Sequence, residues 1–143
     1  MNKTTKFKMC NRWLAVIMLL IFISGLQLEV TSGMYQWSVW VHIFLGLVLT
    51  ILSLYHIFLH YRKSNWFARF SRNRNTSTRI LWWIFMLTAI SGIAASFIWA
   101  ADYAHSKLGA VHGKLGFLMV IMAIIHVSRH IKRRKKNKSM ARY

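Results

Sequence analysis

The chain of 143 residues contains no proline, one cysteine and only two acidic residues. Without proline, no helix is kinked by one, and every backbone amide can be hydrogen-bonded within its own helix. The single cysteine, Cys10, excludes an intrachain disulfide. The acids, Glu29 and Asp102, stand near the ends of apolar segments. The scarcity of acids and the lack of proline both count against a transporter built from broken helices and acidic ligands.

Apolar residues and positive charge are what the chain has in excess. Hydrophobic residues make up 56% of the sequence, yet the formal net charge is +18. The two are segregated along the chain, which favours a membrane over nucleic acid as the partner of the basic residues. Four apolar segments each approach the ~20 residues that cross a bilayer as a helix; they lie at roughly 13–30, 37–60, 80–101 and 108–128. The sequence therefore predicts an all-α membrane protein with a bundle of four transmembrane helices.

The basic residues predict how the chain is oriented. They gather in three places, which are residues 1–12, a middle loop at 62–79 and a tail at 132–143. By the positive-inside rule all three lie in the cytoplasm, and so do both termini. The transmembrane domain then covers 13–131, and the tail is expected to be disordered or held against anionic lipid. Membrane lipid, and no nucleic acid, is the partner that this charge pattern predicts.

An internal repeat divides the transmembrane domain into two helix pairs, at about 13–61 and 80–131. Ile23-Ser24-Gly25 recurs 67 residues later as Ile90-Ser91-Gly92. Four further positions, His42, Gly46, His56 and His60, recur 70 residues later as His112, Gly116, His126 and His130. A cleaved signal peptide at 1–33 is the alternative for the first segment. The third segment resembles the first and cannot be a signal, which favours the repeat.

The recurring histidines fall inside apolar segments, where an imidazole is costly and usually functional. His42 and His56 are 14 residues apart, which is about 21 Å along a helix axis. The second is only about 40° short of four full turns from the first, so both point to nearly one face. The second helices of the two pairs run in the same direction. The repeat therefore predicts that His42 meets His112 at an outer level. It likewise predicts that His56 meets His126 at an inner level.

Two opposed imidazoles at one depth match the axial positions of a six-coordinate haem iron, and helix bundles commonly hold haem. Because the chain lacks a Cys-x-x-Cys-His motif, the haem would be non-covalent haem b. Two such groups are predicted, with His42, His112, His56 and His126 as the iron ligands. His60 and His130 lie at headgroup level. We expect them to contact propionates or to act as ligands in the alternative register.

Four glycines also belong to the predicted site. Gly46 and Gly116 lie one turn inward from the outer histidines, and Gly25 and Gly92 belong to the first helix of each pair. A missing Cβ lets a flat macrocycle approach the backbone. Close helix packing by small residues is the alternative. The repeated placement beside His42 favours the macrocycle.

Two families share parts of this pattern. His-x13-His on two parallel helices of a four-helix unit resembles the di-haem cytochrome b of quinol–cytochrome c oxidoreductases. A second resemblance, to the bacterial flavinylation-associated cytochrome domain, is carried by His42-Ile43-Phe44-Leu45-Gly46 and His56-Ile57-Phe58-Leu59-His60. That family, formerly a domain of unknown function, has a His-x3-Gly and a later His-x3-His pattern. The pattern occurs twice here, so the resemblance covers about residues 13–130.

The resemblance implies a multi-pass protein of the bacterial cytoplasmic membrane that transfers electrons across it. It also implies quinol as the donor and a flavin-bearing extracytoplasmic protein, or another redox subunit, as the acceptor. The chain has no flavin-attachment motif, nucleotide-binding loop or metal-cluster motif. We therefore expect an electron-transfer subunit rather than a self-contained enzyme. The alternative from the residues alone is a histidine-based divalent-metal transporter or sensor, because imidazole also suits zinc, copper and nickel.

Overall fold

Four helices make up the chain wherever its structure is described. The computed structural model describes residues 2–32, 34–61, 76–102 and 107–140. The helices are α1 (Lys3–Thr31), α2 (Gln36–Tyr61), α4 (Thr76–Asp102) and α5 (Lys107–Met140). Their positions match the four apolar segments, so the all-helical prediction is confirmed for these residues.

Each helix is long and apolar enough to cross a membrane. The candidate spans are Thr5–Thr31, Gln36–His60, Thr76–Ala101 and Lys107–Lys132. Large apolar side chains cover the outer surfaces of the helices; Phe44, Phe58 and Phe97, for example, are 64%, 65% and 74% exposed. An apolar surface of this extent is unusual for a protein dissolved in water, whereas lipid solvates it. The chain is therefore a multi-pass membrane protein with helices that contact lipid.

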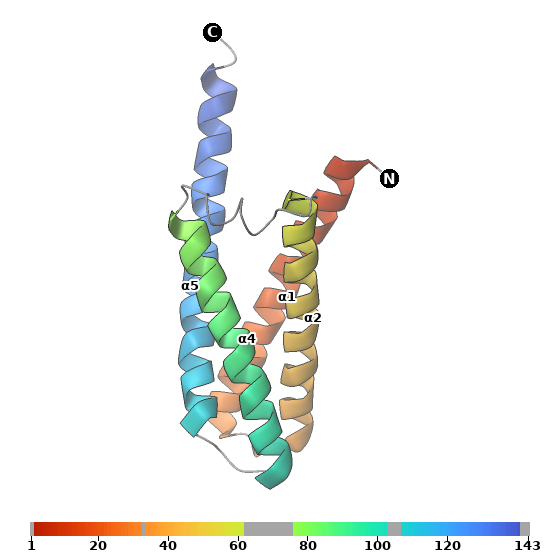
Figure 1. Cartoon of the computed structure of the whole chain (residues 1–143), viewed down its shortest axis with the longest axis vertical. Coiled ribbons are helices and arrows are strands. Elements are labelled where there is room, and N and C mark those ends of the chain that lie inside the picture. The colour runs from red at the N-terminus through yellow and green to blue at the C-terminus, as the bar shows by residue number, and fades with distance from the viewer. Residues whose placement is uncertain (1, 33, 62–75, 103–106, 141–143) are drawn as a thin grey trace.

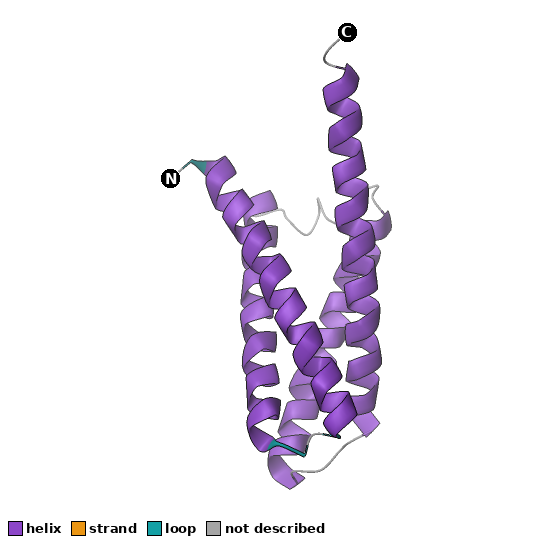
Figure 2. Cartoon of the chain, turned by 180° about the vertical axis from the view of Figure 1, so that it is seen from behind, coloured by secondary structure: helices purple, strands orange, loops and turns teal. Residues whose placement is uncertain are grey.

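The helices associate as two pairs (Figure 1). Most of the packing lies between α1 and α2 and between α4 and α5, with smaller contacts of α1 with α5 and of α2 with α4. The pairs lie close together at the end where α2 begins, and they diverge toward the end that carries both termini (Figure 2). Both α2 and α5 run toward the termini, as the colours of Figure 1 show. Because these two helices are parallel, corresponding positions on them lie at similar heights.

A small apolar core joins the two pairs near the middle of the bundle. Its buried members, each no more than 9% exposed, are Leu49 of α2, Ile84 and Phe85 of α4, and Met119 of α5. Half-buried side chains of α1, such as Leu14 and Ile17, pack against it. Leu49 is midway in sequence between His42 and His56. The core therefore separates the two histidine levels.

Helices α1 and α5 extend beyond the apolar segments into the basic ends of the chain. Helix α1 begins at Lys3, and α5 continues to Met140, past the end of its span at Lys132. Lysine and arginine favour helices, and neither proline nor glycine interrupts residues 132–140. Of the two alternatives for the tail, disorder is therefore wrong as far as Met140, and contact with anionic lipid stays a prediction. Residues 62–75 of the predicted basic loop lie outside the described chain, and residues 76–79 form the first turn of α4.

Candidate functional site

The two outer histidines face each other across the bundle. His42 lies in the second turn of α2 and His112 in the second turn of α5, toward the end away from the termini. Their imidazole ring centres are 6.1 Å apart, and the ring planes are nearly perpendicular, at 82°. The structure thus brings together two histidines that belong to different helix pairs.

His42 is held from α1 by Ser24. This serine is buried, and its hydroxyl donates a hydrogen bond to the backbone carbonyl of Ile21, with an oxygen–oxygen distance of 2.9 Å. The same hydroxyl oxygen lies 2.8 Å from Nδ1 of His42. Because the hydroxyl hydrogen is already donated to Ile21, the oxygen accepts the hydrogen on Nδ1. The neutral imidazole of His42 then carries its lone pair on Nε2, the nitrogen that can bind a metal.

His112 is held from α4, but the group that accepts its Nδ1 hydrogen is a backbone carbonyl and not a serine hydroxyl. Its Nδ1 lies 3.0 Å from the backbone carbonyl oxygen of Thr88 and 3.3 Å from the hydroxyl oxygen of Ser91. A carbonyl oxygen can only accept, so Nδ1 of His112 carries a hydrogen. The hydroxyl of Ser91 donates to the same carbonyl of Thr88, at 3.1 Å. His112 therefore has the same tautomer as His42, with its lone pair on Nε2.

Gly25 and Gly92 make room for the histidine rings themselves. A Cβ at Gly25 would lie 3.3 Å from Cε1 of His42, and one at Gly92 would lie 2.7 Å from Cε1 of His112. The second distance is shorter than real Cβ contacts, so a side chain at position 92 would push the His112 ring away. Each glycine lies next to a serine that contacts the same histidine. In the structure these glycines therefore position the imidazoles, which is a function that the sequence did not suggest for them.

Gly46 and Gly116 lie four residues beyond His42 and His112, on the same helix faces. A Cβ at Gly46 would make an ordinary 3.5 Å contact with the side chain of Ile21. At Gly116 no described atom outside the local helix backbone lies within 4 Å of that position. A flat group can therefore approach the backbone more closely at Gly116 than at Gly46.

The inner histidines are arranged differently from the outer pair. On α2, the ring centres of His56 and His60 are 5.6 Å apart, and Phe7 of α1 packs against both rings, at 5.2 Å and 5.1 Å. The helix pairs diverge toward this end (Figure 2). The ring contacts at this level thus join α1 to α2, and the pairing of His56 with His126 stays a prediction.

Burial distinguishes the two possible inner ligand pairs, His56 with His126 and His60 with His130. His56 and His126 are partly buried, whereas His60 and His130 are exposed. Nδ1 of His56 is buried and has no hydrogen-bond partner within the described residues. His56 is therefore a better candidate than His60 for a buried ligand position.

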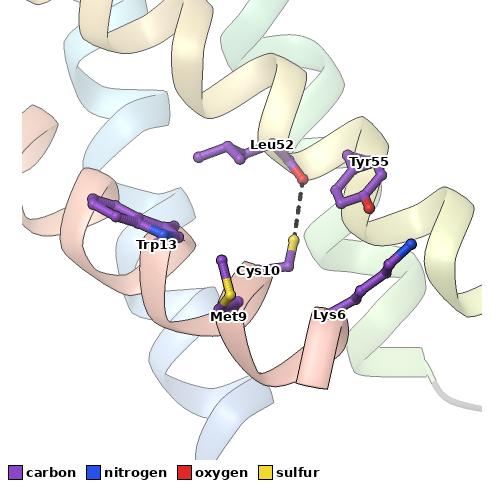
Figure 3. Close-up of a pocket in the computed structure, with 6 residues that line it drawn as sticks. All are labelled: Lys6, Met9, Cys10, Trp13, Leu52 and Tyr55. Atoms are coloured by element: carbon purple, nitrogen blue, oxygen red, sulfur yellow. Dashed lines mark hydrogen bonds between the residues drawn. The ribbon is translucent and has the colours of Figure 1, made fainter. Parts of the chain in front are cut away.

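A pocket beside Cys10 contains none of the predicted site residues (Figure 3). Cys10 is buried between α1 and α2, and its thiol lies 3.9 Å from the carbonyl oxygen of Leu52. The pocket has a volume of about 160 Å³ and is lined by Lys6, Met9, Cys10, Trp13, Leu52 and Tyr55. Without a histidine in its lining, this pocket offers no axial ligand for a haem.

The outer site fits a haem by its donors and by its spacing. With metal–nitrogen bonds of about 2 Å, two imidazoles on opposite sides of one ion have ring centres about 6 Å apart. His42 and His112 have that separation, and both present an unprotonated Nε2. In the described part of the chain, no group of three or more His, Cys, Asp or Glu side chains is arranged to hold a metal ion. His42 and His112 are therefore the only two protein ligands that this part of the described chain offers at the outer site.

Sequence reasoning missed the residues that hold the outer histidines. Ser24 and Ser91 were visible as part of the repeat, beside Gly25 and Gly92, and that recurrence is the signal that could have identified them. The carbonyl of Thr88 is a backbone group and leaves no such signal. Comparison of the chain with models of protein families, with curated proteins and with solved structures finds no match.

Proposed function

We propose that this protein is a b-type di-haem cytochrome that transfers electrons across the cytoplasmic membrane of a bacterium. The observation that carries the proposal is the opposed pair His42 and His112, each with Nδ1 engaged and Nε2 available. Two axial nitrogens at one depth are what a six-coordinate haem iron needs. The histidine repeat and the segregation of charge in the sequence support the rest of the proposal.

In the proposed outer site, His42 and His112 would hold the haem iron by their Nε2 atoms. Ser24 and the carbonyl of Thr88 fix the tautomer and direction of the two rings. Such acceptors also raise the basicity of the ligating nitrogen. A bound haem supplies an iron centre that gains and loses one electron. The partial burial of both rings limits the access of water, which influences the reduction potential.

We place the second haem at the inner level, between His56 and His126. The partial burial of both residues supports this choice. His60 and His130, which are exposed, would contact propionates or replace the inner ligands in the alternative register. The two levels are 14 residues apart on α2, or about 21 Å along its axis. Two centres at these depths provide a route across most of the apolar layer.

The proposed orientation has both termini in the cytoplasm and the His42–His112 site near the outer face. Both termini lie at one end of the bundle (Figure 1), where the first turns of α1 and the last turns of α5 are rich in basic residues. The two repeated helix pairs then enter and leave the membrane in the same sense. Quinol is the proposed donor, and a flavin-bearing extracytoplasmic protein or another redox subunit is the proposed acceptor.

An optical spectrum tests the haem proposal directly. The full chain, expressed with a supply of haem and purified in detergent, should show sharp low-spin haem bands when the dithionite-reduced spectrum is compared with the oxidised one. A histidine-based metal transporter would instead purify with divalent metal and without these bands. A colourless, iron-free preparation would overturn the proposal.

Histidine variants test which residues ligate each haem. His42→Ala and His112→Ala should each remove the outer haem and leave about half of the haem content, because one of two iron sites loses an axial ligand. His56→Ala should remove a different haem population, and His60→Ala should retain both. If His60→Ala removes a haem and His56→Ala does not, the inner register is the alternative one.

A further inference from the structure

The recurring serines of the two helix pairs differ in what they do for the outer histidines. We infer that Ser24 is a positioning residue for His42, whereas on α4 the positioning group for His112 is the backbone carbonyl of Thr88 rather than Ser91. This inference rests on the proposed haem site. It predicts that removing the hydroxyl of Ser24 weakens haem binding more than removing the equivalent hydroxyl of Ser91.

The side chain of Ser24 is the connection between α1 and the ring of His42. Its oxygen lies 2.8 Å from Nδ1, and its hydrogen is committed to the carbonyl of Ile21. The structure gives Nδ1 of His42 no second acceptor within the described chain. Removing the hydroxyl would leave this nitrogen without a partner in an apolar site. The imidazole proton could then move to Nε2, where it would block metal binding.

His112 lies closer to its supporting helix than His42 does. A Cβ on Gly92 would be 2.7 Å from Cε1 of His112, against 3.3 Å for the corresponding pair of Gly25 and His42. This close approach is what allows Nδ1 of His112 to reach a backbone carbonyl, at 3.0 Å, in preference to the hydroxyl of Ser91, at 3.3 Å. A carbonyl that no side-chain substitution removes therefore orients this ring.

Loss of the Ser91 hydroxyl should even favour the carbonyl contact. A carbonyl oxygen has two lone pairs, and the helical amide four residues ahead uses one of them. The hydroxyl of Ser91 and Nδ1 of His112 share the second lone pair of the Thr88 carbonyl oxygen. Without the Ser91 hydroxyl, Nδ1 of His112 is the only side-chain group that donates to the Thr88 carbonyl. Ser91→Ala should therefore weaken haem binding less than Ser24→Ala.

The experiment compares haem retention in the full-length purified protein. Haem loss to an excess of apomyoglobin is followed for the unmodified protein, Ser24→Ala and Ser91→Ala. Loss of a partner behind a metal ligand typically costs 10–100-fold in affinity, so Ser24→Ala should lose one haem about 10–100-fold faster. Its outer haem should also show a raised reduction potential, because a less basic imidazole stabilises the oxidised iron less.

Two further variants separate positioning from packing. Ser24→Thr keeps a hydroxyl that can make the same bonds and should restore slow haem loss. Ser96→Ala removes a comparable serine on α4, which donates to the carbonyl of Ile93 at 2.8 Å, and should behave like the unmodified protein. Equal rates for Ser24→Ala and Ser91→Ala would overturn the inference while leaving the haem proposal intact. An unmodified protein without haem would overturn the proposed function itself.

Discussion

At the scale of single residues, the outer site depends on which nitrogen of each imidazole carries the proton. A neutral imidazole offers one donor and one acceptor, and the hydrogen bond made by one nitrogen decides the state of the other. Both His42 and His112 donate from Nδ1, although their acceptors are a hydroxyl and a carbonyl. Ordinary helix-interior groups are thus enough to leave the Nε2 atoms of both rings without a proton.

Gly92→Ala should selectively impair the outer site. The added Cβ would lie 2.7 Å from Cε1 of His112, so the ring must shift away from α4 and lose its contact with Thr88. Haem content should fall by about half, to that of a protein lacking one axial ligand. Helix content, measured by circular dichroism, should be retained, because alanine favours a helix by about 1 kcal/mol over glycine.

Gly113→Ala is the matched control for this change. It adds the same methyl group one residue after His112, where no described atom outside the local backbone lies within 4 Å. Its haem content should equal that of the unmodified protein. If Gly92→Ala also retains both haems, the ring of His112 does not depend on its close approach to α4.

At the scale of helices, each pair forms one half of the outer site. The histidine comes from α2 or α5, and the group that orients it comes from α1 or α4 of the same pair. This division agrees with the packing, which lies mostly within the pairs. The interface between the pairs is then where a ligand shared by His42 and His112 would lie. Packing between the pairs sets the distance between the two rings.

Leu49→Ala should destabilise the contact between the pairs. Leu49 is 4% exposed and belongs to the core with Phe85 and Met119. Large-to-small core changes cost about 2–5 kcal/mol in soluble proteins, and we expect about 2 kcal/mol here, because lipid is as apolar as leucine and packing alone is lost. Thermal unfolding in detergent micelles, followed by circular dichroism, should show a lower midpoint.

Phe44→Ala provides the comparison for Leu49→Ala on the same helix. Phe44 is 64% exposed and is positioned to contact lipid or detergent. Its truncation removes more side-chain atoms but should change the midpoint much less. A larger shift for Phe44→Ala than for Leu49→Ala would mean that an interface lies on the outer face of α2.

At the scale of the whole molecule, charge and apolar surface are distributed along one axis. The helices present apolar side chains around the middle of the bundle, and both termini extend from one end (Figure 1). Helix α5 continues from its span to Met140, so the basic residues that follow Lys132 extend beyond the apolar layer. In the proposed orientation this basic helical extension lies in the cytoplasm.

Single cysteines test this orientation. In a Cys10→Ala background, Met34→Cys and Met140→Cys place thiols at opposite ends of the bundle, at positions that are 76% and 59% exposed. A membrane-impermeant maleimide added to intact spheroplasts should label position 34. Position 140 should react only after the membrane is permeabilised. The reverse pattern would place both termini outside and would contradict the proposed direction of the two sites.

The sequence by itself determined the four helices and the position of each histidine along them. Helix formation in lipid follows from local properties, because each apolar segment satisfies its backbone hydrogen bonds internally and needs about 20 residues to cross. The recurrence of His42 as His112 likewise predicted that both lie at the same depth, because the depth of a residue in a membrane-spanning helix depends on its position in the sequence. The sequence did not predict the buried environment of Cys10 or the helical tail.

Only the tertiary structure decided which group orients each histidine and how closely the rings approach. The serine precedes its histidine by 18 residues in the first pair and by 21 in the second, so the two copies are not identical in sequence spacing. A shift of a few tenths of an ångström between helices then selects a hydroxyl in one pair and a carbonyl in the other. Such shifts arise from close packing at residues like Gly92, where atoms distant in sequence compete for the same space.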